Sequence, residues 1–185
     1  MRQACGFSLL EVLVATSIAT VGVATLGQLC VIVIRANDSA KTTTFAAILA
    51  QEKMEQLRGL TWGTDALGVP VSDTTTNITV APESAADGVG LSPSPPDTLG
   101  RNTRGYCDFV DGVGNTLGGG PAPPAGAVYV RRWSVERLPA NPDNTLVLQV
   151  LVTHLRRRGS ADSVAGATRW PDEARLVSVK TRKAS

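Results

Sequence analysis

The chain has 185 residues, 43% of them hydrophobic, and a formal net charge of +2 at pH 7. This length is enough for one modest domain with an appendage. So small a net charge indicates no general affinity for nucleic acid or acidic lipid, which argues against a chain built mainly to bind either.

The first predicted element is a long apolar helix. Residues 7–34 contain one charged side chain, Glu11, and the run is longer than the roughly 20 apolar residues that span a bilayer as a helix. A secretory signal peptide has a shorter apolar run followed by a small-residue cleavage site, whereas here Gly6 precedes the run. We therefore predict a single-pass membrane helix. A carboxylate in such a segment is costly and usually has a partner.

The residues around this carboxylate form a motif. The sequence GFSLLEVLVA at residues 6–15 resembles the cleavage and methylation signature of type IV prepilins and type II secretion pseudopilins. The resemblance implies that residues 1–6 are a leader, that a prepilin peptidase cuts after Gly6, and that the new amino group of Phe7 is N-methylated. It also implies that Glu11 meets the positive N-terminus of a neighbouring subunit during assembly, which would offset the cost of burying a carboxylate.

The same resemblance implies a location and a set of partners. Arg2 would stay in the cytoplasm and the C-terminal domain would enter the periplasm, before assembly into an extracellular pilus. The single basic residues Arg2 and Arg35 on either side give the positive-inside rule little weight, so the orientation follows from processing. The implied partners are the prepilin peptidase, other minor and major pilins through the N-terminal helix, the inner-membrane assembly platform and the lipid bilayer.

The helix is expected to continue past the membrane to about residue 60, where Gly59 is a plausible C-terminal stop. Its second half, residues 35–60, is predicted to be amphipathic. One face is formed by Ala47, Ala50, Met54 and Leu57, and the other positions are filled by Gln51, Glu52, Lys53, Glu55 and Arg58. The segment AAILAQEKMEQLR at residues 46–58 is similar to a helix shared by PilV-type minor pilins and I-type minor pseudopilins.

Residues 61–127 are predicted to be a variable loop region. Seven of the 11 prolines and ten of the 18 glycines lie between residues 82 and 126, and both residue types interrupt regular structure. Residues 74–80 are the one short strand expected there. Cys107 is the only cysteine beyond the apolar helix, so no disulfide is expected in this domain. We expect Cys107 to be a buried, small apolar residue.

Residues 128–185 are predicted to form an antiparallel sheet. Strand-like runs cover residues 128–138, 145–155 and 174–182. Alternation places Leu146, Leu148, Val150 and Val152 on one face of the second run, and Tyr129, Trp133 and Val135 on one face of the first. The expected fold class is therefore α+β. A long N-terminal membrane-spanning helix would pack by its second half on a sheet of three or four strands, as in the pilin fold.

No catalytic motif is apparent, so we expect a protein that is not an enzyme and that needs no cofactor. His154 is expected to be a surface residue. Asp108, Asp111 and Asn115 lie near glycines and could in principle hold Ca²⁺, but their spacing favours an ordinary solvated turn. No metal site is therefore predicted.

The last third of the chain is rich in arginine and lysine, including Arg131, Arg132, Arg156, Arg157, Arg158, Arg169, Arg175, Lys180, Arg182 and Lys183. We expect most of them on a solvated sheet face, and DNA binding is the less favoured reading. The function predicted is a minor type IV pilin that joins the priming or tip complex and promotes pilus assembly, adhesion or motility. The alternatives are a minor pseudopilin of type II secretion and a DNA-uptake pilin.

Overall fold

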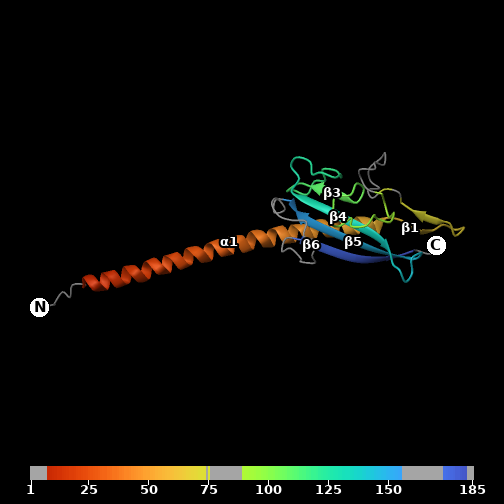
Figure 1. The fold of residues 1–185 in the computed structure, drawn as a ribbon. Helices are drawn as coiled ribbons and strands as arrows, with labels where there is room; N and C mark the ends of the chain where they lie inside the picture. Colours follow the sequence, from red (N-terminus) through yellow and green to blue (C-terminus); the bar gives the residue numbers. More distant parts are fainter. Residues whose placement is uncertain (1–7, 74, 76–88, 156–172, 183–185) are drawn as a thin grey trace. The chain divides into compact units, whose positions relative to one another are not determined.

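The computed structural model describes residues 8–73, 75, 89–155 and 173–182. Contacts divide the chain into two units, Met1–Lys41 and Thr42–Ser185, which are treated separately below. In chain order the elements are α1 (Leu9–Gly59), β1 (Trp62–Thr64), β2 (Pro70–Ser72), β3 (Cys107–Val110), β4 (Tyr129–Arg137), β5 (Thr145–His154) and β6 (Glu173–Thr181), as Figure 1 shows.

The predicted long helix is confirmed as α1, which ends at the expected Gly59. In the first unit its large apolar side chains are exposed all around the helix. A helix that is apolar on every side requires an apolar surrounding, because water would be in contact with all of these side chains.

The three predicted C-terminal strands are also confirmed, as β4, β5 and β6. They form an antiparallel sheet with the order β3-β4-β5-β6. Trp133 of β4 lies opposite Val150 of β5, and Val150 lies opposite Leu176 of β6. Facing residues in an antiparallel pair point to the same side of the sheet, so this register gathers the apolar side chains on one face.

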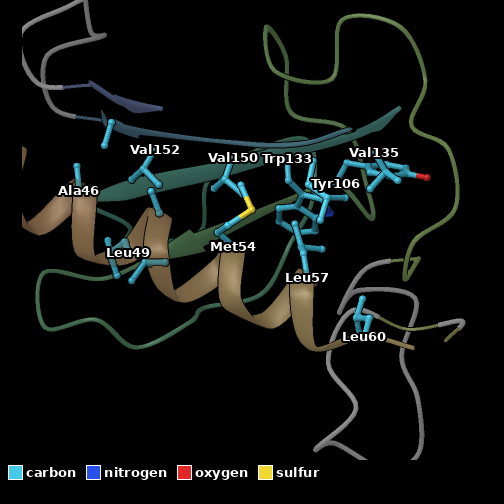
Figure 2. Close-up of a cluster of buried hydrophobic side chains, with 14 of the residues drawn as sticks. Ala46, Leu49, Met54, Leu57, Leu60, Tyr106, Trp133, Val135, Val150 and Val152 are labelled. Carbon is cyan, nitrogen blue, oxygen red and sulfur yellow. The ribbon is translucent and has the colours of Figure 1, made fainter. Parts of the chain in front are cut away.

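That face packs against residues 42–59 of α1 and forms the hydrophobic core. Figure 2 shows side chains of α1 and of the sheet pointing toward one another. The buried cluster consists of Ala46, Leu49, Ala50, Met54, Leu57, Leu60, Leu91, Tyr106, Val110, Tyr129, Trp133, Val135, Leu146, Leu148, Val150, Val152 and Ala174. This is the expected α+β arrangement of a helix on a four-stranded antiparallel sheet, and it fits the pilin fold.

Two helix positions differ from the prediction. Ala47 is exposed and Lys53 is buried, whereas the periodicity placed Ala47 on the apolar face and Lys53 in solvent. The buried face runs through Ala46, Leu49 and Ala50 and continues through Lys53. These positions keep the spacing of three and four residues, but the buried face starts one residue earlier than predicted, at Ala46, and includes the charged side chain of Lys53.

The described residues of the region expected to be mostly loop contain three strands that were not predicted. β1 and β2 form a hairpin, and β3 is the first strand of the main sheet. Each has only three or four residues, which is too short for alternation to be recognised. The strand predicted at residues 74–80 lies outside the described residues except for Thr75, which is in no strand.

The face of β3 and β4 that points away from α1, here called the second face, is covered by the chain around residues 97–121. The Nε and one terminal nitrogen of Arg132 both donate to Oδ1 of Asn102, at 2.9 and 2.7 Å. The thiol of Cys107 donates to the carbonyl of Gly120 at 3.2 Å. Cys107 is fully buried, as predicted, and burial raises the pKa of its thiol. The Gly-rich segment is thus a packed layer over the sheet.

Candidate functional site

The candidate assembly site is the start of α1. Glu11 lies in the first helical turn and is exposed. Its backbone N–H donates to the carbonyl of Ser8 at 3.0 Å, and the N–H of Val12 donates to the same oxygen at 3.2 Å. The N-terminal end of a helix carries a partial positive charge, which favours a carboxylate in the first turn. Gly6 and Phe7, the predicted cleavage and methylation residues, lie outside the described residues.

The helix that carries Glu11 is suited to an apolar medium. It is long enough to cross a membrane, and its most apolar stretch has a mean hydropathy of 2.1 with none of its residues buried. Its hydroxyl groups are satisfied within the helix, since Thr16, Ser17, Thr20 and Thr25 each donate to a carbonyl three or four residues earlier. Internal hydrogen bonding of this kind is what a lipid environment demands.

A second polar feature lies inside the core of the other unit and was not predicted. We call Lys53, Asp108 and Arg131, together with Glu52, the buried charge cluster. The Nζ of Lys53 lies 2.8 Å from Oδ2 of Asp108. The guanidinium of Arg131 donates to both Asp108 oxygens, at 2.7 and 3.0 Å. The side chains of these three residues are 4%, 7% and 3% exposed.

The sheet register and the helix face together assemble this cluster. Asp108 of β3 is the cross-strand partner of Arg131 of β4, so their side chains project to the same side. Lys53 reaches them from α1 and also lies over the ring of Trp133, 4.2 Å from its centroid. Glu52 contacts the other terminal nitrogen of Arg131 at 3.4 Å. Two cations therefore face two carboxylates, and the cluster has no net charge.

The pKa shifts follow from this arrangement. Burial lowers the pKa of Lys53, and the attraction of Asp108 only partly opposes that effect. Burial alone would raise the pKa of the Asp108 carboxyl, but Lys53 and Arg131 together lower it. The lowered pKa of Asp108 favours its charged carboxylate, which is the form that binds both cations. The cluster links one helix to two strands, and it acts as a structural element of the core.

The three possible calcium residues do not form one cluster, because Asp108 is bound elsewhere than Asp111 and Asn115. Asp108 is engaged by Lys53 and Arg131, while Asp111 closes a turn of its own. Oδ1 of Asp111 accepts hydrogen bonds from the backbone N–H groups of Val113, Gly114 and Asn115. Oδ2 accepts from the Asn115 side chain at 2.9 Å, and these hydrogen bonds lower the pKa of Asp111. The favoured interpretation of this segment, an ordinary turn, agrees with these hydrogen bonds.

The expectation that His154 is a surface residue is met in part. His154 is partly buried, and its ring meets the ring of Tyr129 edge-on, with centroids 4.9 Å apart. Tyr129 in turn lies 5.3 Å from the ring of Phe45. This geometry is typical of aromatic packing. His154 therefore packs against Tyr129, a residue of the core, while part of its side chain stays exposed.

The prediction of a solvated basic face is wrong for two residues. Arg131 and Arg132 are 2% and 3% exposed, because acceptors on the two sides of the sheet bind their side chains. Lys180 donates to the carbonyl of Arg58 at the end of α1. Arg182 lies over the Trp62 ring, 4.9 Å from its centroid. Five of the basic residues, namely Arg156, Arg157, Arg158, Arg169 and Lys183, lie outside the described residues.

Comparison with known protein families adds one finding. Residues 1–27 match the prokaryotic N-terminal methylation motif, the signal of type IV prepilin-like proteins. No curated protein and no solved structure matches the chain significantly. The motif supports a type IV pilin or pseudopilin, which is a structural subunit rather than an enzyme. It implies processing by a prepilin peptidase and assembly with other pilins, and the apolar helix is consistent with a membrane-anchored pilin.

Proposed function

We propose that the chain is a minor type IV pilin. After cleavage behind Gly6 and N-methylation of Phe7, it would remain in the inner membrane with its C-terminal domain in the periplasm. It would then join a priming or tip complex, enter an extracellular pilus, and promote pilus assembly, adhesion or motility. The observation that carries this proposal is the methylation motif at residues 1–27 on a helix whose apolar surface is fully exposed.

The position of Glu11 supports an assembly role. A carboxylate among exposed apolar side chains is costly in lipid, and an opposite charge from a neighbouring subunit would offset that cost. Cleavage behind Gly6 would create such a charge, the amino group of Phe7, on every processed subunit. Pairing between Glu11 and that amino group would then favour one axial register between neighbouring helices.

Two other functions were considered with this one. A minor pseudopilin of type II secretion would carry the same N-terminal motif, and residues 46–58 resemble the helices of both groups. The minor pilin is preferred because about 125 residues follow the helix, more than the small soluble domain of the I-type pseudopilins. DNA uptake is less favoured, since the side chains of Arg131 and Arg132 are buried and cannot reach phosphate groups.

Quantitative mass spectrometry of sheared surface filaments tests the proposal. Recovery at a small fraction of the dominant subunit would support a minor component of an extracellular pilus. Retention of the processed protein in the cell envelope, with none in sheared filaments, would support the pseudopilin. Cells that lack the prepilin peptidase provide the control. This protein should then be absent from the sheared fraction, because assembly requires processing.

A further inference from the structure

The last strand, β6, buries little apolar surface. Leu176 lies opposite Val150, so Ala174, Leu176, Ser178 and Lys180 are the residues of β6 that face α1. Of these four, Ala174 alone is buried, and Leu176 is partly buried. On the same face of β5, four residues are fully or almost fully buried, namely Leu146, Leu148, Val150 and Val152. β6 lies at one edge of the sheet, and we expect it to be held less firmly than the strands beside it.

Two cationic side chains give the C-terminal end of β6 further contacts, and we call Lys180 and Arg182 the clasp. The Nζ of Lys180 donates to the backbone carbonyl of Arg58, in the last turn of α1. The last carbonyls of a helix lack partners within it and carry a partial negative charge, so an ammonium group is favourable there. The guanidinium of Arg182 lies over the ring of Trp62 in β1, 4.9 Å from its centroid, an attractive contact between a cation and an aromatic face.

The clasp thus contacts the chain on both sides of the point where α1 ends and the β1–β2 hairpin begins. Figure 1 shows β1 and the end of β6 at the same end of the domain. The N–H of Arg182 donates to the carbonyl of Asn144 at 2.9 Å, which fixes the clasp beside the start of β5. The clasp therefore joins the last strand to the hairpin.

The hairpin itself is closed by its own hydrogen bonds. Oδ2 of Asp73 accepts from the N–H of Thr61 at 2.6 Å, and the N–H of Asp73 donates to the Thr61 carbonyl. β1 and β2 pair over three residues. The ring of Trp62 packs against the hydrophobic core, whereas Val69 and Val71 are exposed. The hairpin is therefore a small folded unit that meets the core through Trp62, the residue that Arg182 covers.

We propose that the clasp holds the β1–β2 hairpin against the end of the core, and that the hairpin and the end of β6 open together as one local unit. Folded proteins open locally in cooperative units, at a lower free energy than global unfolding. Opening of this unit would uncover Trp62 and the last turn of α1, and would leave the buried face of β4 and β5 in place. Closure of the segment that follows α1 would then depend on the last strand of the chain. The inference does not depend on the proposed function.

Hydrogen–deuterium exchange of the full-length chain in detergent, read by mass spectrometry, tests this proposal. The double variant Lys180→Met/Arg182→Met removes both cations and keeps side chains of similar reach. We expect peptides that cover residues 61–73 and 177–182 to exchange about tenfold faster than in wild type, as expected for loss of a cation–π contact and of a cation at a helix C-terminus. Peptides from β4 and β5 should keep their wild-type rates.

The matched control is Arg101→Met/Arg175→Met, which removes two exposed cations outside the clasp and should leave both sets of peptides unchanged. Unchanged exchange of residues 61–73 in the clasp variant would overturn the proposal. So would equal acceleration in β4 and β5, which indicates global destabilisation, or the same acceleration in the control.

A substitution on the other side of the contact gives a second readout. Trp62→Leu keeps an apolar side chain against the core and removes the aromatic face that Arg182 covers. Because coupling between two sites is reciprocal, we expect this change in the hairpin to speed the exchange of residues 177–182 several-fold. Val71→Ala, at an exposed position of β2, is the control and should have no such effect. Wild-type exchange of residues 177–182 in Trp62→Leu would show that the two elements do not open together.

Discussion

The ammonium group of Lys53 lies 2.8 Å from the carboxylate of Asp108, and less than a tenth of either side chain is exposed. Lys53 belongs to α1 and Asp108 to β3, the strand at one edge of the sheet. Because Arg131 of β4 binds the same carboxylate, one acidic side chain joins the helix to two neighbouring strands.

Removing the acid should therefore cost far more than removing one cation. We predict that Asp108→Asn lowers the free energy of unfolding by about 3–5 kcal/mol, because it removes the buried carboxylate that both cations share and leaves only the exposed Glu52 beside Arg131. Lys53→Met should change it by less than about 1.5 kcal/mol, since Arg131 still binds Asp108 and a buried charge is removed. Denaturant unfolding of the full chain in detergent measures both. A larger loss for Lys53→Met than for Asp108→Asn would contradict this account.

Asp108 should also determine how the free energy of unfolding decreases at acid pH. Its pKa is lowered in the folded protein, from an unfolded value of about 3.9. The unfolded state then binds the proton more tightly, so the stabilisation is complete above about pH 4 and is lost as the pH falls through the folded pKa. The difference in unfolding free energy between wild type and Asp108→Asn should shrink as the pH drops below about 4.

The same titration carried out on Asp111→Asn provides the control. The pKa of Asp111 is also lowered, by hydrogen bonds within its own turn, but its side chain is outside the core. A gap between wild type and Asp108→Asn that stays constant down to the lowest pH at which the chain folds would show that ionisation of Asp108 is not what stabilises the fold.

Cys107 offers a chemical test of the layer over the second face of the sheet. Its thiol is buried and its pKa is raised, and a thiol in that state reacts slowly with alkylating reagents. Asn102→Ala removes the acceptor that Arg132 uses to hold the covering segment. In a Cys30→Ala background, we expect this variant to be labelled at Cys107 several-fold faster than the parent. Rapid labelling of the folded parent would be inconsistent with the packed layer.

Glu11 should act in assembly rather than in insertion or cleavage. We predict that Glu11→Ala enters the membrane and is cleaved as in wild type, but is recovered from filaments at a much lower level, because the charge opposite the neighbouring N-terminus is lost. Immunoblots of membrane and sheared-filament fractions measure the two steps. Arg58→Ala, at an exposed ion pair with Glu55, is the control substitution. Normal incorporation of Glu11→Ala would argue against this role.

The sequence is informative where a pattern is long and regular. The apolar run of residues 7–34 predicts the helix. The alternation of Leu146, Leu148, Val150 and Val152 predicts the buried face of β5. Both patterns report burial of many like side chains, which the hydrophobic effect dominates. The N-terminal motif is equally visible, because its residues are adjacent in the chain.

The remaining features depend on contacts between distant residues. Lys53 follows Ala50 by three positions, and Arg131 alternates with Tyr129 and Trp133, so their places on the buried faces could have been read from the sequence. The sequence could not show why these two residues tolerate burial. Their counter-charge, Asp108, lies more than 20 residues from either of them, on a strand that is too short to predict.

The central claim is that the chain is a prepilin, and the N-terminal peptide of the mature protein tests it most directly. Tandem mass spectrometry of membrane-extracted protein should find a chain that begins at Phe7 and carries one methyl group on its α-amino nitrogen. An N-terminus at Met1, or at any residue within the apolar helix, would contradict the claim and with it the assembly role of Glu11.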